Sequence, residues 1–386
     1  MRIACLSTSQ IPSSTANSIQ VMKMCQALVQ LGHTVRLWVP GKTQVAWSQL
    51  AAHYGLRDRF EINWVASFPV LRRYDFVAKA WLQVMAWSPD LVYTWMPQVG
   101  LLALQARLPL VLEIHDRPSG KIGPRLLRWI VRVKGEKRFA VITQALYRVL
   151  REEWGMVIPE TQVVIAPNGV DLERYRDLPT PSEARRLLGL AERFTAVYSG
   201  HFYPGRGMGL LLEMACRLPH IQFLWVGGRE EAVTYWRNTV AEHRLQNVIL
   251  TGFVENRLLP LYQAAGEVLL MPYERAVAGS SGGNSADICS PMKMFEYLAC
   301  GRAILSSDLP VLHEVLNEKN ARFCPPEEIN AWEQALDELA AHPEVCRELG
   351  EQARADAAHY TWVARAQRIL AGWNSDRANP LEVGER

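Results

Sequence analysis

Short runs of apolar residues recur along the chain, and segments with helical periodicity separate them. The run from Arg2 to Ser7 is followed by a polar loop and then by Ile19 to Leu31, in which apolar residues return at helical spacing until Gly32. This spacing predicts a helix, and the next apolar run, Val35 to Val39, predicts a second strand. Strand, helix, glycine and strand in this order indicate a βαβ unit with parallel strands.

The alternation continues through both halves of the chain. Further strands are predicted at Asp90–Tyr93, Leu108–Ile114, Phe139–Thr143, Val163–Ile165, Ala196–Ser199, Gln222–Val226, Val248–Thr251 and Val268–Met271. The polar segment 172–192 contains two prolines and is expected to be an interdomain linker. We therefore predict an α/β protein with two Rossmann-like, doubly wound domains, residues 1–175 and 190–358, that face a central cleft. An amphipathic C-terminal helix at about 360–375 is expected to pack back on the first domain.

The composition is that of a globular protein, with 49% apolar and 21% charged residues. No apolar run reaches the ~18 residues of a membrane span, and the N-terminal run is interpreted as a strand and not as a signal peptide. The seven cysteines are scattered, without a C-x-x-C pair, which favours reduced thiols. We expect a cytoplasmic protein.

The net charge of +3 conceals an asymmetry. Residues 1–190 carry 24 Lys and Arg against 14 Asp and Glu, whereas residues 191–386 carry 18 against 25. A basic half is typical of proteins with an anionic partner, either a membrane surface or a nucleic acid. Two halves that differ only in the charge of their surfaces would give the same counts.

One segment of the basic half, residues 121–138, is also amphipathic. Its apolar residues fall on one face of a predicted helix, and arginines flank that face. Basic amphipathic helices that contain tryptophan bind anionic membrane surfaces, which favours a protein peripheral at the inner face of a membrane. The candidates for membrane contact are Arg125, Arg128, Trp129 and Arg132. The alternative is a helix packed on the core with a solvated basic edge.

The stretch from 275 to 310 combines a flexible loop with a short helix. Small residues, Gly279 to Gly283, precede a helix predicted from Met292 to Cys300, with Pro291 and Gly301 as its start and stop signals. Backbone N–H groups converge on an anion where such a loop enters a helix. An anion-binding loop and an ordinary surface loop before a core helix are both compatible with this pattern.

Four passages carry a resemblance to a known family. They are Asn168–Asp171, Ser199–Gly207, Leu250–Val254 and Ser290–Pro310. In this order and spacing the chain resembles, over nearly its whole length, the retaining GT-B glycosyltransferases, and specifically the glycosyltransferase family 4 and group 1 sugar transferases. The resemblance implies retaining, metal-independent transfer of a hexose-type sugar. The donor would be a UDP- or GDP-linked sugar, and the acceptor a lipid-linked or envelope glycan or glycolipid. No cofactor and no metal site are expected.

The resemblance assigns residues of the last passage to the donor. Glu296 matches the second of two acidic residues that bracket the donor, and a carboxylate there accepts hydrogen bonds from both ribose hydroxyls. The first acidic position is Ile288 here, with Asp287 beside it. Contacts to the transferred sugar are therefore expected from Asp287 or from the backbone N–H groups of Ile288, Cys289 and Ser290. Lys293 belongs to a Ser-Pro-x-Lys variant of the motif.

The family also places cations beside the diphosphate. The two matching positions are His201 and Arg206 in this chain. Arg206 keeps the positive charge and adds a planar fork suited to phosphate oxygens. A fixed cation there stabilises the leaving group more in the transition state than before it. His201 is expected to bind as a neutral hydrogen-bonding group or to pack in its loop. Gly252, Phe253 and Val254 match the backbone segment that contacts the base.

In the first half the resemblance singles out one histidine and one loop. His115 stands at the predicted carboxyl end of a strand, where it can reach the donor sugar or the acceptor. With Arg206 and Glu296 it completes the predicted catalytic set. The glycine-rich first loop of relatives is replaced on the acceptor side by Ser14, Thr15, Ala16 and Asn17. Small residues there still let a sugar or phosphate approach the backbone.

Other functions remain open at this point. A nucleotide-sugar 2-epimerase shares the two-domain architecture and would need no acceptor. A non-enzymatic membrane- or nucleic-acid-binding protein with a degenerate donor site is the second alternative, because Ile288 replaces an acidic residue. No nucleic acid is expected, since the basic residues of 121–138 alternate with aliphatic residues and not with aromatic stacking platforms.

Overall fold

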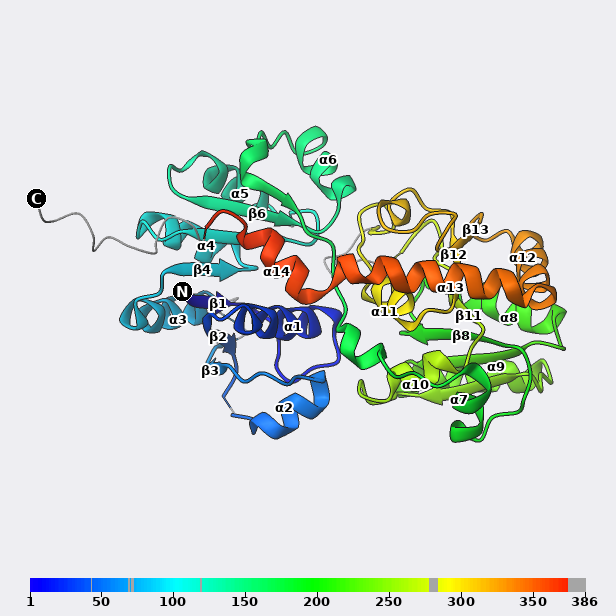
Figure 1. Ribbon diagram of the computed structural model, residues 1–386. Coiled ribbons are helices and arrows are strands. Elements are labelled where there is room, and N and C mark those ends of the chain that lie inside the picture. The colour runs from blue at the N-terminus through cyan, green and yellow to red at the C-terminus, as the bar shows by residue number, and fades with distance from the viewer. Residues whose placement is uncertain (43, 69, 71–72, 119, 278–283, 374–386) are drawn as a thin grey trace, which may run out of the picture.

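The computed structural model describes residues 1–373 except 43, 69, 71–72, 119 and 278–283. The described chain forms two parallel sheets, one on each side of Figure 1. The first sheet has the order β3-β2-β1-β4-β5-β6-β7. Its strands are β1 (Arg2–Leu6), β2 (Thr34–Pro40), β3 (Glu61–Val65), β4 (Leu91–Thr94), β5 (Leu110–Ile114), β6 (Lys137–Val141) and β7 (Val163–Ile165).

Helices cover both faces of this sheet. Alternate residues of β1 show it, because Ala4 and Leu6 belong to one apolar cluster whereas Ile3 and Cys5 belong to another. A strand buried on both sides reads as a continuous apolar run, which is the pattern that the sequence displays. The helices are α1 (Ala16–Gln30), α2 (Trp47–Tyr54), α3 (Tyr74–Trp87), α4 (Pro97–Gln105), α5 (Gly123–Arg132) and α6 (Gln144–Glu152).

The second sheet repeats the plan with the order β10-β9-β8-β11-β12-β13. Its strands are β8 (Thr195–Gly200), β9 (Gln222–Gly227), β10 (Val248–Gly252), β11 (Val268–Met271), β12 (Ala303–Ser307) and β13 (Arg322–Cys324). Its helices are α7 (Pro181–Leu188), α8 (Met208–Arg217), α9 (Glu230–Glu242), α10 (Leu259–Ala264), α11 (Met292–Cys300), α12 (Ile329–Ala341) and α13 (Pro343–Ala357). The prediction of two doubly wound parallel domains is confirmed.

The last helix, α14 (Trp362–Leu370), leaves the second domain and packs on the first, beside α1 (Figure 1). Its apolar face, Trp362, Ala366 and Ile369, joins the cluster that covers one face of the first sheet. The prediction of a returning C-terminal helix is therefore confirmed. An isolated parallel bridge between Val170 and Thr361 places the two crossings between the domains side by side.

The linker predicted at 172–192 is wrong over part of its length. Residues 181–188 form α7, whose Ala184 is buried in the core of the second domain. Thr180 and Glu183 make a capping box at its start, and Gly189 ends it in the left-handed region with φ 67°. The threonine, the glutamate and the glycine stand at helix-capping positions, and Pro181 occupies the first turn of the helix, where proline is tolerated.

The basic amphipathic helix is also shorter than predicted. It ends at Arg132, and Lys137 and Arg138 belong to β6. The ammonium group of Lys137 bonds the carbonyl of Val133, and Arg138 bonds the carbonyl of Ala371 at 2.8 Å. These two cations therefore support the fold. None of the helices in the described part of the chain is long and apolar enough to cross a membrane.

Candidate functional site

A cavity of about 1110 Å³ opens between the carboxyl ends of the two sets of strands. Loops after β1, β4 and β5 line it from the first domain, and loops after β8 and β10 line it from the second. The predicted site residues that line it are Ser14, Thr15, Ala16, Asn17, His115, His201, Arg206, Phe253, Val254, Ile288, Cys289, Ser290, Lys293 and Glu296. Gly252 and Asp287 do not line it. The loop Gly279–Gly283 lies outside the described residues.

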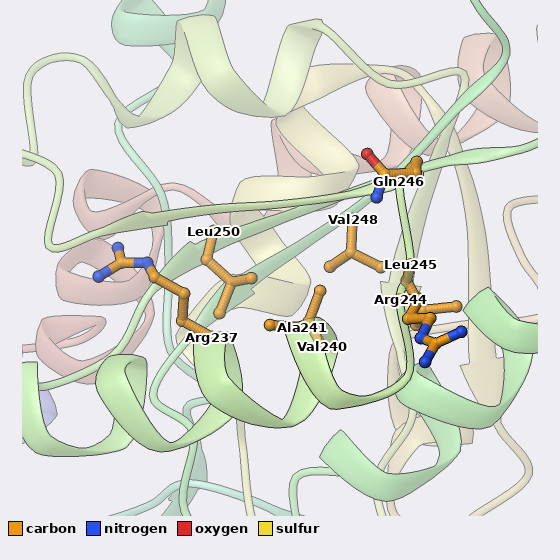
Figure 2. A pocket seen from close by; sticks show the side chains of 8 residues that line it. All are labelled: Arg237, Val240, Ala241, Arg244, Leu245, Gln246, Val248 and Leu250. Carbon is orange, nitrogen blue, oxygen red and sulfur yellow. The ribbon is translucent and has the colours of Figure 1, made fainter.

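A second hollow, of about 410 Å³, lies on the outer edge of the second sheet, between α9 and β10. Figure 2 shows Arg237 and Arg244 at its two ends and aliphatic side chains between them. Its lining includes no carboxylate, histidine or thiol. The carboxylates and histidines that could take part in a reaction therefore line the cleft and not this second hollow.

Two cations sit on aromatic faces in the wall of the cleft. The Lys293 Nζ lies 3.8 Å from the ring centroid of Tyr198, and the Arg206 guanidinium lies 4.9 Å from that of Tyr273. Burial lowers the pKa of Lys293 well below its ordinary value, Arg206 lowers it further, and Glu296 opposes them. None of the ion pairs among the described residues includes either cation. The wall therefore carries positive charge that is matched to an anion.

The backbone around Lys293 makes room for its side chain. Gly200 adopts φ 144°, and a Cβ atom there would lie 2.8 Å from the Lys293 Nζ. The backbone angle favours glycine, and a larger residue would also displace the end of the Lys293 side chain. The sequence motifs include Lys293 and Arg206 but not Tyr198 and Tyr273. Both tyrosines lie at the carboxyl ends of apolar strands, where an aromatic residue is not distinguished from the core.

His201 lies beside these cations as a neutral group. Burial lowers the pKa of His201, and the charges of Lys293, Arg229 and Arg206 lower it further. Its ring stacks on Tyr203, with centroids 4.7 Å apart, and its buried Nδ1 has no hydrogen-bond partner within the described part of the chain. A neutral ring with an unpaired nitrogen in the cavity wall can bind a phosphate oxygen or a hydroxyl.

Glu296 lies one helical turn after Lys293 on α11, so both side chains face the cavity. The Gln263 Nε2 is 3.4 Å from the Glu296 Oε2 and donates a 3.0 Å bond to the Ser199 hydroxyl. Glu296 is half-buried and retains an oxygen for a ligand. The helix thus presents a cation and an acceptor on one face.

The segment before α11 makes the domain contact. Ile288 is 1% exposed, and its side chain belongs to the apolar cluster of the first domain. Its carbonyl accepts a 2.9 Å bond from the Thr143 hydroxyl. The N–H groups of Ile288 and Cys289 both donate to the carbonyl of Ser285, at 3.2 and 3.0 Å. Those two amides, which we considered for the transferred sugar, are engaged within the segment.

Asp287 also joins the domains. Its carboxylate lies 2.5 Å from an Arg117 guanidinium nitrogen, and this hydrogen bond lowers the pKa of Asp287. Glu314 makes a second link, because its carboxylate oxygens accept 2.7 Å bonds from the N–H groups of Gln144 and Ala145 at the start of α6. Polar bonds therefore join the two domains beside the cleft, in addition to the apolar packing of Ile288.

Helix α5 packs on the core of the first domain with one face and exposes a basic edge with the other. Leu127 and Ile130 are buried in the first domain, while Trp129 and Ile122 are more than half exposed. Arg125, Arg128 and Arg132 are exposed on the same side of the molecule as Trp129 along this helix. Ile122 and Leu126 also line the cavity. The basic, aromatic edge of α5 thus adjoins the mouth of the cleft.

Two doubly wound parallel domains that share a cleft define the GT-B class of fold, and solved structures share it. Sucrose-phosphate synthase from Thermosynechococcus elongatus superposes with a TM-score of 0.75 at 18% identity, over 95% of this chain and 97% of that chain. HepE of Anabaena, solved with UDP, gives 0.74 at 18% identity, over 96% and 98%. At this identity the likeness concerns the fold.

Family models match both halves: Glycosyltransferase Family 4 over residues 18–174, and Glycosyl transferases group 1 over residues 193–342. The chain therefore belongs to this family of GT-B glycosyltransferases. Alpha-galactosylglucosyldiacylglycerol synthase of Streptococcus pneumoniae is 28% identical over 53% of this chain and 52% of its own length. Phosphatidyl-myo-inositol mannosyltransferase of Mycolicibacterium smegmatis is 26% identical over 62% and 58%. The chain thus spans about half the length of these curated relatives.

Proposed function

We propose that the protein is a retaining, metal-independent glycosyltransferase that moves a hexose-type sugar from a nucleoside diphosphate sugar to a lipid-linked or glycan acceptor. The observation that carries the proposal is the pair of half-buried cations, Lys293 and Arg206, on the same wall as Glu296. In this proposal residues 190–358 bind the donor, and residues 1–175 bind the acceptor.

The cations suit a diphosphate leaving group. When the bond between the sugar C1 and the diphosphate oxygen breaks, negative charge grows on that oxygen. Arg206 and Lys293, fixed by their tyrosine rings, stabilise this charge without reorganisation. His201 adds a neutral donor beside them. These side chains supply the positive charge that a divalent cation provides in other transferases.

Glu296 suits the ribose. An ionised carboxylate accepts two hydrogen bonds, and a ribose offers two adjacent hydroxyls. Phe253 and Val254 border the same cavity and provide a backbone edge for the base. HepE of Anabaena was solved with UDP and with UDP-glucose, which favours a UDP-linked donor for this chain as well.

Retention follows from a front-face route in this proposal. The acceptor oxygen attacks C1 on the side from which the diphosphate departs, and its proton passes to the departing phosphate oxygen. The carboxylates in the cavity wall are Glu113, Asp116 and Glu296. Glu113 is paired with Arg365, and Asp116 accepts a bond from the Arg117 N–H. The ion pair engages both oxygens of Glu113, and the proposed route uses neither Glu113 nor Asp116 as a nucleophile.

The acceptor half of the cavity contains an apolar patch beside its polar and charged side chains. Trp95, Pro97, Leu112, Ile122 and Leu126 line it. An acceptor with an apolar portion fits such a wall, and the names of the two curated relatives describe enzymes of glycolipid synthesis. We propose a peripheral, cytoplasmic enzyme whose α5 edge rests on the membrane. Transfer of label from UDP-glucose that requires a lipid extract supports this activity, whereas acceptor-independent release of a sugar that is inverted at C2 indicates a 2-epimerase.

Replacing Glu296 with glutamine is expected to weaken UDP binding about 10- to 100-fold, because hydrogen bonds to a charged group contribute roughly 1.5–3 kcal/mol. The measurement is the rise in melting temperature with UDP concentration, with GDP in a parallel series to identify the base. Glu333→Gln serves as the control, since Glu333 pairs with Arg217 on the outer surface. Equal UDP affinity in the wild type and the Glu296 variant would remove Glu296 from the site.

The membrane contact gives a separate prediction. Changing Arg125, Arg128 and Arg132 together to glutamine should lower binding to anionic phosphatidylglycerol vesicles about 100-fold, at about 1 kcal/mol per basic residue. Vesicle flotation at two salt concentrations measures it. The charge-matched control changes Arg217, Arg322 and Arg347, all on the second domain. If both triple variants lose binding equally, overall charge is responsible and not α5.

A further inference from the structure

A buried chain of polar groups runs from the cleft into the C-terminal helix. The His115 Nε2 lies 2.5 Å from the Glu113 Oε2. The two terminal nitrogens of Arg365 each lie 2.7 Å from one oxygen of Glu113. Both charged side chains are buried, at 1% exposure for Arg365 and 0% for Glu113. Among these hydrogen-bonded groups, His115 has a ring that is partly exposed and lines the cavity.

Pairing with Arg365 keeps the carboxyl group of Glu113 ionised. Burial acts to raise the pKa of Glu113, but the charge and hydrogen bonds of Arg365 outweigh burial, with a smaller effect from His115, and hold this pKa well below its usual range. The Tyr93 hydroxyl donates to the same carboxylate, and the Gln20 amide lies 3.3 Å from it. Glu113 is therefore an anion that only accepts hydrogen bonds.

An acceptor at Nε2 fixes the state of the histidine ring. The hydrogen of a neutral His115 must sit on Nε2, where Glu113 accepts it, so Nδ1 is left as a hydrogen-bond acceptor. The same bond fixes the rotation of the ring. Without Glu113 the ring could carry its hydrogen on either nitrogen, and Nδ1 would act as a donor in part of the molecules.

We propose that Arg365 and Glu113 are positioning residues of the transfer site, which hold His115 so that its Nδ1 accepts a hydrogen bond from a hydroxyl of a bound substrate. This inference rests on the glycosyl transfer proposed above. It makes α14 a part of the active site, although Arg365 stands 252 positions after Glu113. The sequence carries no local signal for such a contact.

A merely structural role for the pair is the competing explanation. Buried ion pairs contribute little net stability compared with apolar residues of similar volume, although removing one partner is costly. The second domain holds a less buried pair, in which the Arg185 side chain is 4% exposed and lies 2.8 Å from Glu267, whose side chain is 23% exposed. Neither of these residues lines the cleft. This pair therefore serves as a control for the loss of an arginine–carboxylate pair away from the cleft.

The experiment compares two double variants. Glu113→Gln with Arg365→Met replaces the first pair by neutral side chains of similar size, so that no uncompensated charge is buried. Arg185→Met with Glu267→Gln does the same for the control pair. We expect both proteins to fold, with circular dichroism and UDP-dependent melting shifts like those of the wild type. Turnover of UDP-glucose with a lipid extract should fall about 10- to 100-fold in the Glu113/Arg365 variant and should not change in the Arg185/Glu267 variant.

Two further readouts separate positioning from fold. Nitrogen-15 spectra of the imidazole rings should show the Nε2–H form for His115 in the wild type and a mixture of forms in the Glu113/Arg365 variant. Hydrolysis of UDP-glucose without acceptor identifies the hydroxyl. A fall in both hydrolysis and transfer assigns it to the donor sugar, and a fall in transfer alone assigns it to the acceptor.

The outcomes are distinguishable. A wild-type protein that binds no UDP and turns over no nucleotide sugar contradicts the proposed function, whatever the variants do. A wild-type protein that is active, with a Glu113/Arg365 variant that keeps its turnover within twofold and its Nε2–H form, overturns the positioning role. Equal losses in the two double variants overturn it as well.

Discussion

Replacing Lys293 with methionine is expected to lower turnover by about 10²- to 10³-fold while raising the melting temperature of the empty protein. The first effect follows from the loss of a fixed cation at the leaving group, and losses of this size are typical when one stabilising donor is removed. The second effect has the opposite sign because the empty site buries the ammonium group without a carboxylate partner. Methionine fills a similar volume without that cost.

The pH dependence of stability checks the physical reason. Burial and Arg206 lower the pKa of Lys293 in the folded state, while the unfolded chain keeps an ordinary lysine pKa of about 10.4. Between the two values the unfolded state binds more protons, so the stability of the empty wild type rises with pH. Below the folded pKa the destabilisation is present in full. The melting difference between Lys293→Met and the wild type should therefore shrink as the pH approaches about 10.

Two comparisons guard this prediction. Lys319 is an exposed lysine of the second domain, and Lys319→Met should change neither turnover nor melting. Added UDP should stabilise the wild type far more than the Lys293 variant, because the diphosphate supplies the missing anion. A Lys293 variant that melts lower than the wild type and keeps its UDP response would show that the lysine is structural.

Replacing Ile288 with glutamate, the residue type that the family pattern has there, is expected to impair the enzyme. Ile288 is buried in the apolar cluster that contains Leu112, Ile142 and Leu146 of the first domain. A carboxyl group there must either be protonated or move out. Raising its pKa by about three units costs about 4 kcal/mol. We expect a lower melting temperature, an opened domain contact and a KM for UDP-glucose that rises at least tenfold.

Ile288→Val provides the matched control, because it removes one methylene group and costs about 0.5–1.5 kcal/mol without adding charge. Initial rates across a UDP-glucose series and melting curves for both variants measure the contrast. A glutamate variant with higher turnover than the wild type would mean that position 288 faces the donor sugar. That result would contradict the packing of this segment against the first domain.

The fold was predictable because its signal is repeated. Each parallel strand is an apolar run, and each helix between strands has its own period, so two doubly wound domains follow from the pattern alone. Lys293, Glu296 and Arg206 were singled out through the family resemblance, and all three line the cleft, while their roles toward a donor stay predictions. Helix α7 was missed although Thr180, Glu183 and Gly189 marked its ends.

What the sequence could not supply are contacts made across the fold. The rings of Tyr198 and Tyr273 became cation platforms only when β8 and β11 were brought beside α11. Asp287 looked available for a sugar, but its partner Arg117 comes from the other domain. Ile288 looked like a lost catalytic residue, and the structure makes it an apolar anchor. Lys293 stands 95 positions after Tyr198, and Asp287 stands 170 positions after Arg117.

The chain passes between the two domains at Val170 and again at Thr361, and these two segments lie side by side. The first domain is composed of two stretches of chain, because α14 supplies both an apolar cover for α1 and the guanidinium that neutralises Glu113. A fragment that ends near Val170 would lack α14. The apolar face of α1 would be exposed, and the buried Glu113 carboxylate would lose its partner Arg365. Expressing the halves separately should therefore yield a foldable second half and an insoluble first half, unless the last helix is fused back to it.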